Sequence, residues 1–164
     1  MSITAADVAK LRSLTGAGMM DCKKALDESE GDMEKAGELL RKKGIIKAAK
    51  RTDKIAAEGT TQVKVNGNTA VVLEVNSETD FVAQNEDFKK LASDFADALL
   101  ANKPQTVEQA MAEKIGDETL QDRLNNLTAK IGEKIVLRRY AVVEKTDADA
   151  FGAYSHLGGK ISVL

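Results

Sequence analysis

Residues 61–75 read TQVKVNGNTAVVLEV. Polar and apolar residues alternate over 61–66, which is the period of a half-buried β-strand, and a run rich in valine follows over 70–75. Gly67 and Asn68 lie between the two runs and favour a tight turn. The stretch therefore predicts a β-hairpin, in a chain whose other periodicities are mostly helical.

Helical spacing dominates the first 45 residues and predicts three short helices. Thr4 and Asp7 resemble a capping box that opens a helix over about residues 5–14. Gly31 ends the second helix, Asp32 caps the third, and the third is expected to end before Gly44. The apolar stripes that define the helices are, in order, Val8, Leu11 and Leu14; Met19, Cys22, Ala25 and Leu26; and Met33, Ala36, Leu39 and Leu40.

The sequence after the hairpin alternates between helical and extended patterns. A long helix is expected from about residue 85 to before Pro104, with shorter helices over 106–113 and 117–131. A third strand is expected over 135–143, and two short strand fragments around a glycine turn over 153–164. The predicted fold class is α+β: a three-helix bundle, then an antiparallel three-stranded sheet packed with helices.

Four segments follow from these patterns. They are a three-helix module over 1–45, a basic connector over 46–58, an α+β core over 59–145, and the opening strands of a second subdomain over 146–164. The chain stops on an apolar strand pattern without a polar tail, which favours a truncated form of a longer protein.

The composition excludes several kinds of chemistry. One Cys and one His among 164 residues cannot supply the roughly four ligands of a structural zinc site. A Ser-His-acid triad would have to use His156, which lies outside any G-x-S-x-G motif. A lone thiol, no secretory signal and no apolar membrane-spanning window predict a soluble, cytoplasmic protein without a cofactor.

Three features stand out as candidate functional segments. Residues 41–54 carry seven Lys or Arg against one Asp, which fits either a solvated helix end or a surface for an acidic partner or nucleic acid. The glycine loop at 15–18 could hold a phosphate, although it lacks the G-K-[ST] ending of a P-loop. Met19 and Met20 cannot both face one core, so exposure of one at a protein-binding surface competes with partial burial at the corner.

Phe81 has two alternative interpretations. It precedes Phe88 and Phe95 at intervals of seven, so it could extend the core stripe of a single helix. Alternatively, Asn85 is a helix N-cap, which would leave Phe81 on a separate turn with its ring available as a binding anchor.

Two stretches together resemble a known family. Residues 11–26 (LRSLTGAGMMDCKKAL) and 74–83 (EVNSETDFVA) are similar to the two signatures of the bacterial translation elongation factor Ts family, in the same order and separation. The resemblance continues through Gly31-Asp32 and residues 47–50, 57–59 and 130–133.

The resemblance implies a guanine nucleotide exchange factor for elongation factor Tu, not an enzyme that makes or breaks bonds. It implies a helical module similar to ubiquitin-associated (UBA) domains, ahead of a core of two α+β subdomains, of which the first and the opening strands of the second fit into 164 residues. It further implies binding to GDP-bound and nucleotide-free elongation factor Tu, no membrane or direct nucleic-acid contact, and dimerisation as an option for the full-length form.

The family's contact residues can be carried over by position. Asp80 and Phe81, flanked by Thr79 and Val82, match the insertion element. Phe81 would wedge between helices of the partner's GTP-binding domain and disturb the residues that hold Mg²⁺ and the phosphate-binding loop. The other contacts that the resemblance implies are Arg12, Met19, Met20, Lys23, Arg51 and His156. The runner-up hypothesis is an adaptor or RNA-associated module based on the helical bundle and residues 41–54.

Overall fold

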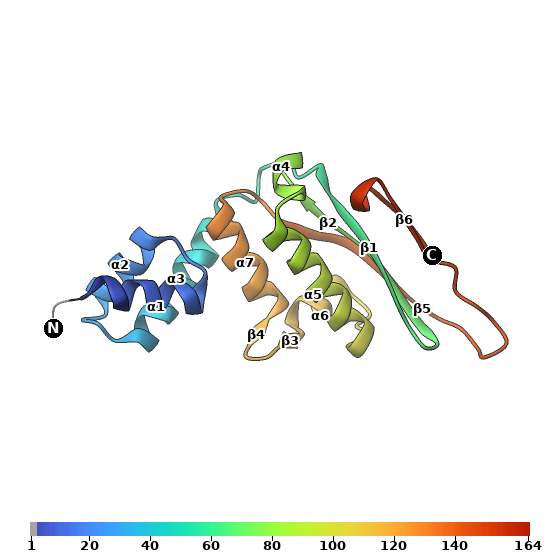
Figure 1. The fold of residues 1–164 in the computed structure, drawn as a ribbon, viewed down its shortest axis with the longest axis horizontal. Helices are drawn as coiled ribbons and strands as arrows, with labels where there is room; N and C mark the ends of the chain where they lie inside the picture. The colour runs from blue at the N-terminus through green and yellow to red at the C-terminus, as the bar shows by residue number, and fades with distance from the viewer. Residues whose placement is uncertain (1–2) are drawn as a thin grey trace. The chain divides into compact units, whose positions relative to one another are not determined.

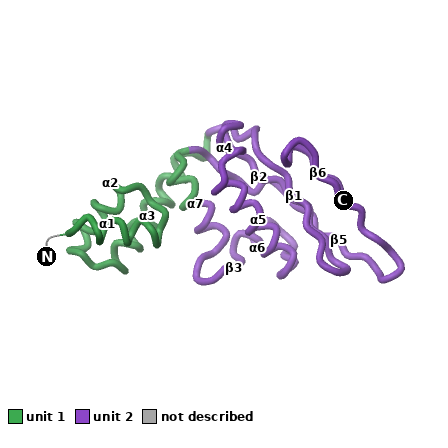
Figure 2. The backbone as a smooth tube through the Cα atoms, viewed as in Figure 1, with its two compact units in different colours: residues 1–53, 125–132 green, residues 54–124, 133–164 purple. Residues whose placement is uncertain are grey.

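The computed structural model describes residues 3–164, which divide into two compact units. Unit 1 is Met1–Asp53 together with Asn125–Gly132, and unit 2 is Lys54–Leu124 together with Glu133–Leu164 (Figure 2). Figure 1 shows the ribbon, with helices at the N-terminal end of the chain and the sheet and its helices after them. This element order confirms the predicted α+β fold class.

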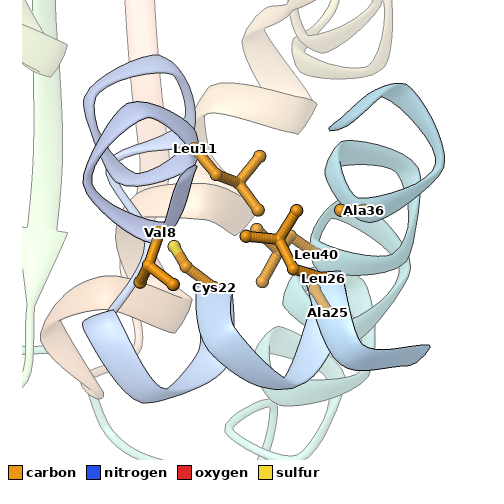
Figure 3. Close-up of a cluster of buried hydrophobic side chains, with 7 residues drawn as sticks. All are labelled: Val8, Leu11, Cys22, Ala25, Leu26, Ala36 and Leu40. Atoms are coloured by element: carbon orange, nitrogen blue, oxygen red, sulfur yellow. The ribbon is translucent and has the colours of Figure 1, made fainter. Parts of the chain in front are cut away.

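Unit 1 is built on three helices around one small apolar core. They are α1 (Ala5–Thr15), α2 (Met19–Glu28) and α3 (Met33–Ala49). Figure 3 shows side chains from all three helices pointing toward one another, with the Cys22 thiol among them. The buried members of this core are Val8, Leu11, Cys22, Ala25, Leu26, Ala36 and Leu40.

The predicted caps of α1 and α3 are confirmed. Asp7 N–H donates to the Thr4 hydroxyl, and Thr4 N–H donates back to the Asp7 carboxylate at 3.0 Å. Hydrogen bonds from the Thr4 hydroxyl and backbone hold the pKa of Asp7 below its ordinary value. Asp32 accepts from Glu34 N–H and Lys35 N–H, which closes the N-terminus of α3.

Two details of the predicted helices are wrong. Leu14 was expected in the core stripe, but its side chain is 70% exposed, because Thr15 follows Val8 and Leu11 on the inner face at a spacing of seven and four. The third helix was expected to end before Gly44, but α3 continues to Ala49. Gly44 is buried, and a Cβ there would lie 3.4 Å from Asn126 Oδ1 and 3.8 Å from Ala129 Cβ, so glycine allows the close approach of residues 125–132.

Unit 2 contains the predicted three-stranded sheet. Its strands are β1 (Glu58–Asn66), β2 (Thr69–Ser77) and β5 (Val136–Glu144), in the order β1-β2-β5 and antiparallel throughout. Gly67 and Asn68 form the turn of the hairpin, with Asn66 paired to Thr69. This confirms both the hairpin and the third strand.

Helices cover one face of this sheet, as Figure 1 shows for α5. The helices in contact with the sheet are α4 (Asp80–Ala83), α5 (Glu86–Asn102) and α6 (Val107–Ala112). The last helix is α7 (Leu120–Ile131), whose residues from 125 onward belong to unit 1. A short hairpin that the sequence did not predict, β3 (Lys114–Ile115) with β4 (Glu118–Thr119), precedes α7. The least exposed apolar side chains of unit 2 include Val71, Leu73, Val75, Phe88, Phe95, Leu99, Leu120 and Leu137.

The last segment forms another small hairpin, which contacts β1. It consists of β6 (Tyr154–His156), the 3-10 turn η1 (Leu157–Gly159) and β7 (Ile161–Val163), which confirms the two predicted fragments around a glycine turn. The Thr61 hydroxyl lies 2.8 Å from Gly159 O and 2.8 Å from Ser162 Oγ, so hydroxyl hydrogen bonds tie this hairpin to β1. No helix among residues 3–164 is long and apolar enough to cross a membrane.

Gly59 is expected to be the glycine of unit 2 that tolerates substitution least. Its φ is 153°, and an added Cβ would lie 2.1 Å from Val75 O on the neighbouring strand. Gly59→Ala should therefore lower the free energy of unfolding by about 2 kcal/mol, because backbone cannot move aside as a side chain can. Urea unfolding measures the change, with Gly67→Ala as control, since Gly67 also has positive φ but has open space around a Cβ. Equal losses in the two variants would contradict the steric argument.

Candidate protein-binding site

The most exposed aromatic ring of the chain lies directly after β2. Phe81 is 83% exposed, although it is one of only four phenylalanines. Phe88 and Phe95, which share its spacing of seven, are both fully buried. The structure thus supports the second interpretation of Phe81 and contradicts the first, in which it extends one core stripe.

Two consecutive caps explain this exposure. Thr79 caps the single turn α4 through its hydroxyl, which accepts from Val82 N–H, and Asn85 caps α5 by accepting from Asp87 N–H and Phe88 N–H. Because α4 and α5 are separate helices, Phe81 does not follow the core face of α5. Val82 and Ala83 are buried against the sheet, and Phe81 is left on the outer side of the turn.

The predicted residues of this element therefore divide into two groups. Asp80 and Phe81 are exposed and lie side by side in sequence at the start of α4. Thr79 is half-buried and Val82 is 8% exposed, so these two side chains hold the turn in place. An exposed ring next to a carboxylate can enter an apolar pocket and bury about 150–250 Å² there.

Glu133 contacts the Thr79 cap of α4, and this contact was not predicted from the sequence. Its two carboxylate oxygens accept hydrogen bonds from Thr79 N–H at 3.0 Å and from the Thr79 hydroxyl at 2.7 Å. It lies 54 residues away in the sequence, in the connection between α7 and β5. The only signal in the sequence was its place in the KIGE stretch at 130–133, which carries no periodicity that points to Thr79.

A second exposed group lies at the α1–α2 corner of unit 1. Met19 and Met20 are 45% and 65% exposed, so both methionines reach the surface. Arg12 and Lys23 are exposed on α1 and α2. Leu14, misassigned to the core, adds a third exposed apolar side chain to this corner. Soft apolar side chains flanked by cations are suited to an apolar, acidic protein surface.

The glycine loop at this corner offers little room for a phosphate group. Gly18 is the N-cap of α2 and supplies no side-chain hydrogen bond. The hollow beside it, lined in part by Thr15, Gly18 and Lys47, is a small cavity of about 30 Å³. Two of the lysines that line it, Lys43 and Lys47, pair with Glu28 at 2.8 Å and Asp21 at 2.9 Å.

The basic segment is largely a helix end. Residues 41–49 are the last half of α3, and Lys43 and Lys47 are paired with Glu28 and Asp21 of α2. This supports the solvated helix end over a free cationic surface. Arg51 follows in the turn after α3 and is half-buried.

His156 lies in unit 2, on the C-terminal hairpin. Its ring is exposed and stacks on Tyr154, with centroids 5.8 Å apart, and the Tyr154 hydroxyl lies 3.0 Å from Nδ1. Nothing in this pair resembles a catalytic arrangement with a nucleophile. Within residues 3–164, no three His, Cys, Asp or Glu side chains converge so as to hold a metal ion.

A comparison with protein-family models gives one finding for this chain. The model described as "Elongation factor TS" matches residues 78–164, which is more than half of the chain. The matched range begins at the α4 element and includes Phe81, Glu133 and His156. Arg12, the two methionines and the rest of unit 1 before α7 precede it. The chain belongs to the elongation factor Ts family of translation factors.

Proposed function

We propose that this protein is a guanine nucleotide exchange factor that binds elongation factor Tu·GDP and promotes GDP release during translation elongation. The observation that carries the proposal is Phe81, a nearly fully exposed ring on a capped turn at the start of the family-matched range. The ring enters the GTP-binding domain of the partner and disturbs the residues that hold Mg²⁺ and the GDP phosphates. Asp80, the residue before it in α4, is also exposed.

Linkage, and not bond chemistry, is the principle of this activity. A protein that binds nucleotide-free elongation factor Tu more tightly than the GDP-bound form weakens GDP binding by the same factor. Such a protein needs side chains that bind the partner and displace the residues that hold GDP there. It needs no cofactor or nucleophile of its own. A chain with one buried thiol and one histidine fits this requirement. We propose that the protein acts in the cytoplasm together with its partner.

The magnitudes indicate that Phe81 does not act alone. A thousandfold acceleration of GDP release corresponds to about 4 kcal/mol of differential stabilisation. Burial of one phenylalanine side chain supplies about 1.5–3 kcal/mol. The rest must come from further contacts, for which the α1–α2 corner with Arg12, Met19, Met20 and Lys23 is the best candidate. Arg51 and His156 are proposed as additional contacts.

Release of a fluorescent GDP analogue tests the proposal directly. Elongation factor Tu loaded with mant-GDP is mixed with excess GDP and increasing concentrations of this chain, and the fluorescence decay is followed by stopped flow. The release rate should rise with concentration and reach a plateau. An unchanged rate over the whole titration would overturn the exchange function. In a parallel binding titration, GDP should weaken the complex by the same factor by which the chain weakens GDP.

A second prediction concerns the α1–α2 corner. Replacing Met19 and Met20 together by Ala should weaken the complex with nucleotide-free elongation factor Tu by about tenfold, because two exposed, flexible apolar side chains lose their contact area. Isothermal titration calorimetry measures the dissociation constant. Val65→Ala is the control, since Val65 is 44% exposed on β1 and belongs to unit 2. Unchanged affinity in the double variant would remove the corner from the interface.

A further inference from the structure

We infer that Glu133 is a positioning residue for Phe81: its carboxylate fixes Thr79 and thereby the α4 turn that carries Phe81. The inference rests on the proposed function of Phe81, and it assigns a role to a residue whose carboxylate binds Thr79, two residues before the ring. Glu133 and Thr79 both belong to unit 2, so the contact lies within one compact body.

The first step of the argument is the geometry at Thr79. One residue presents two donors, its backbone N–H and its hydroxyl, and one carboxylate accepts both, at 3.0 and 2.7 Å. Two hydrogen bonds from adjacent atoms to the two oxygens of one group fix orientation as well as position. An ionised carboxylate suits this task because it is an acceptor at both oxygens, whereas an amide would turn one donor group toward Thr79.

A second hydrogen bond joins the same two chain segments in the opposite direction. Lys134 N–H donates to the Glu78 carboxylate at 2.6 Å, so each chain segment supplies one acidic side chain to the backbone of the other. The Ser77 hydroxyl donates to Thr79 O at 3.0 Å within the same loop, and Ser77 is fully buried. The loop between β2 and α4 is thus tied to the loop between α7 and β5 at two consecutive residues.

The second step leads from Thr79 to the ring. Phe81 is two residues beyond Thr79, and the turn between them is closed by Ala83 N–H on Thr79 O at 3.3 Å and Val82 N–H on the Thr79 hydroxyl at 3.4 Å. A helix of four residues has too few internal hydrogen bonds to persist without support. The direction of Phe81 is therefore set by the anchor at Thr79 together with the buried Val82 and Ala83, and Glu133 holds that anchor.

A purely structural role is the alternative, and the core of unit 2 argues against it. That core is apolar and consists of side chains such as Phe88, Phe95 and Leu99, none of which depends on the carboxylate. Loss of Glu133 should therefore release the α4 turn while the sheet and α5 stay folded. Thermal denaturation of the whole chain therefore cannot detect the loss of this anchor. The mobility of the α4 turn itself has to be measured.

Amide hydrogen exchange tests the positioning without reference to elongation factor Tu. In Glu133→Ala, the amides of Val82 and Ala83 should exchange at least about tenfold faster than in the parent chain, because the acceptors on Thr79 lose their anchor. Amides in the middle of α5 should be unchanged. Glu133→Gln, which keeps one acceptor oxygen, should give an intermediate increase. Unaltered protection at Val82 and Ala83 in Glu133→Ala would overturn the inference.

Exchange kinetics then test whether the turn is used. Glu133→Ala should lower the plateau rate of mant-GDP release by roughly tenfold, with a smaller change in the half-saturating concentration, because contacts from unit 1 remain. Glu113→Ala is the matched control: Glu113 is also half-buried in unit 2 and accepts a hydrogen bond, from Asn102 Nδ2 at 2.7 Å. It should leave the plateau rate unchanged.

A double-variant cycle separates the two hypotheses. If Glu133 acts through Phe81, the plateau rate of Phe81→Ala/Glu133→Ala equals that of Phe81→Ala alone. Multiplied effects would show that Glu133 acts independently and would overturn the inference. A Phe81→Ala variant with the full parent rate would instead overturn the proposed role of Phe81 in exchange, while faster amide exchange at Val82 in Glu133→Ala would still show the anchor.

Discussion

Phe81→Ala is expected to slow the release of GDP from elongation factor Tu by about tenfold to a hundredfold relative to the parent chain at saturation. The range follows from the burial of one phenylalanine side chain, about 1.5–3 kcal/mol, if that energy is gained only when GDP leaves. The ring is 83% exposed in the free protein, so its removal takes nothing from the core. The melting temperature should change by no more than about 1 °C.

The paired measurement of rate and melting temperature makes this prediction specific. Phe81→Leu serves as the conservative control, because it keeps an apolar side chain on the same turn and should retain part of the acceleration. A fall in melting temperature of several degrees in Phe81→Ala would mean that the ring packs in the core after all. An unchanged release rate with an unchanged melting temperature would mean that the exposed ring has another use.

Phe95→Ala is expected to give the opposite pattern. Phe95 is fully buried on α5, where the helix packs against the sheet. Truncation of a buried phenylalanine costs about 3–5 kcal/mol of unfolding free energy, because a cavity remains. For a chain of this size, that loss lowers the melting temperature by roughly 10 °C.

The same substitution at two positions of unit 2 is thus a matched pair. Urea unfolding should show a lower midpoint for Phe95→Ala and the parent midpoint for Phe81→Ala. At a temperature where Phe95→Ala is still folded, its plateau rate of mant-GDP release should match that of the parent. A stable Phe95→Ala variant would contradict the core position of α5.

The elements that the sequence predicted well are those with strong local signals. The hairpin at 61–75 needed only alternation and a Gly-Asn turn, and the strands pair as expected, from Thr61 with Glu74 to Asn66 with Thr69. The caps at Thr4, Asp32 and Asn85 were likewise local, since each depends on residues two or three positions away. Asn85 also gave the one local indication that Phe81 lies outside the long helix.

The details that failed depend on contacts between distant segments. Gly44 was predicted to end the third helix because glycine has a low helix propensity. In the structure residues 125–132 pack against Gly44, and a contact between such distant segments cannot be predicted from helix propensity. Leu14 was assigned to the buried face of the first helix, but Thr15 lies on that face and Leu14 is exposed. The hydrogen bonds between Glu133 and Thr79 join residues 54 positions apart, so no window of sequence could contain both. The exposed position of Phe81 could therefore be predicted from the sequence, but the contact between Glu133 and Thr79 could not.

The anchored α4 turn also bears on how quickly two proteins can meet. Because Thr79 is held before any partner arrives, the backbone turn that carries Phe81 is already formed in the free protein, and docking requires no prior disorder-to-order step of this turn. Association of a preorganised surface proceeds at about 10⁵–10⁷ M⁻¹s⁻¹, whereas a turn that had to form during the encounter would lower that rate. The entropy of ordering this loop is lost once, when the chain folds, and is not lost again at each cycle of binding.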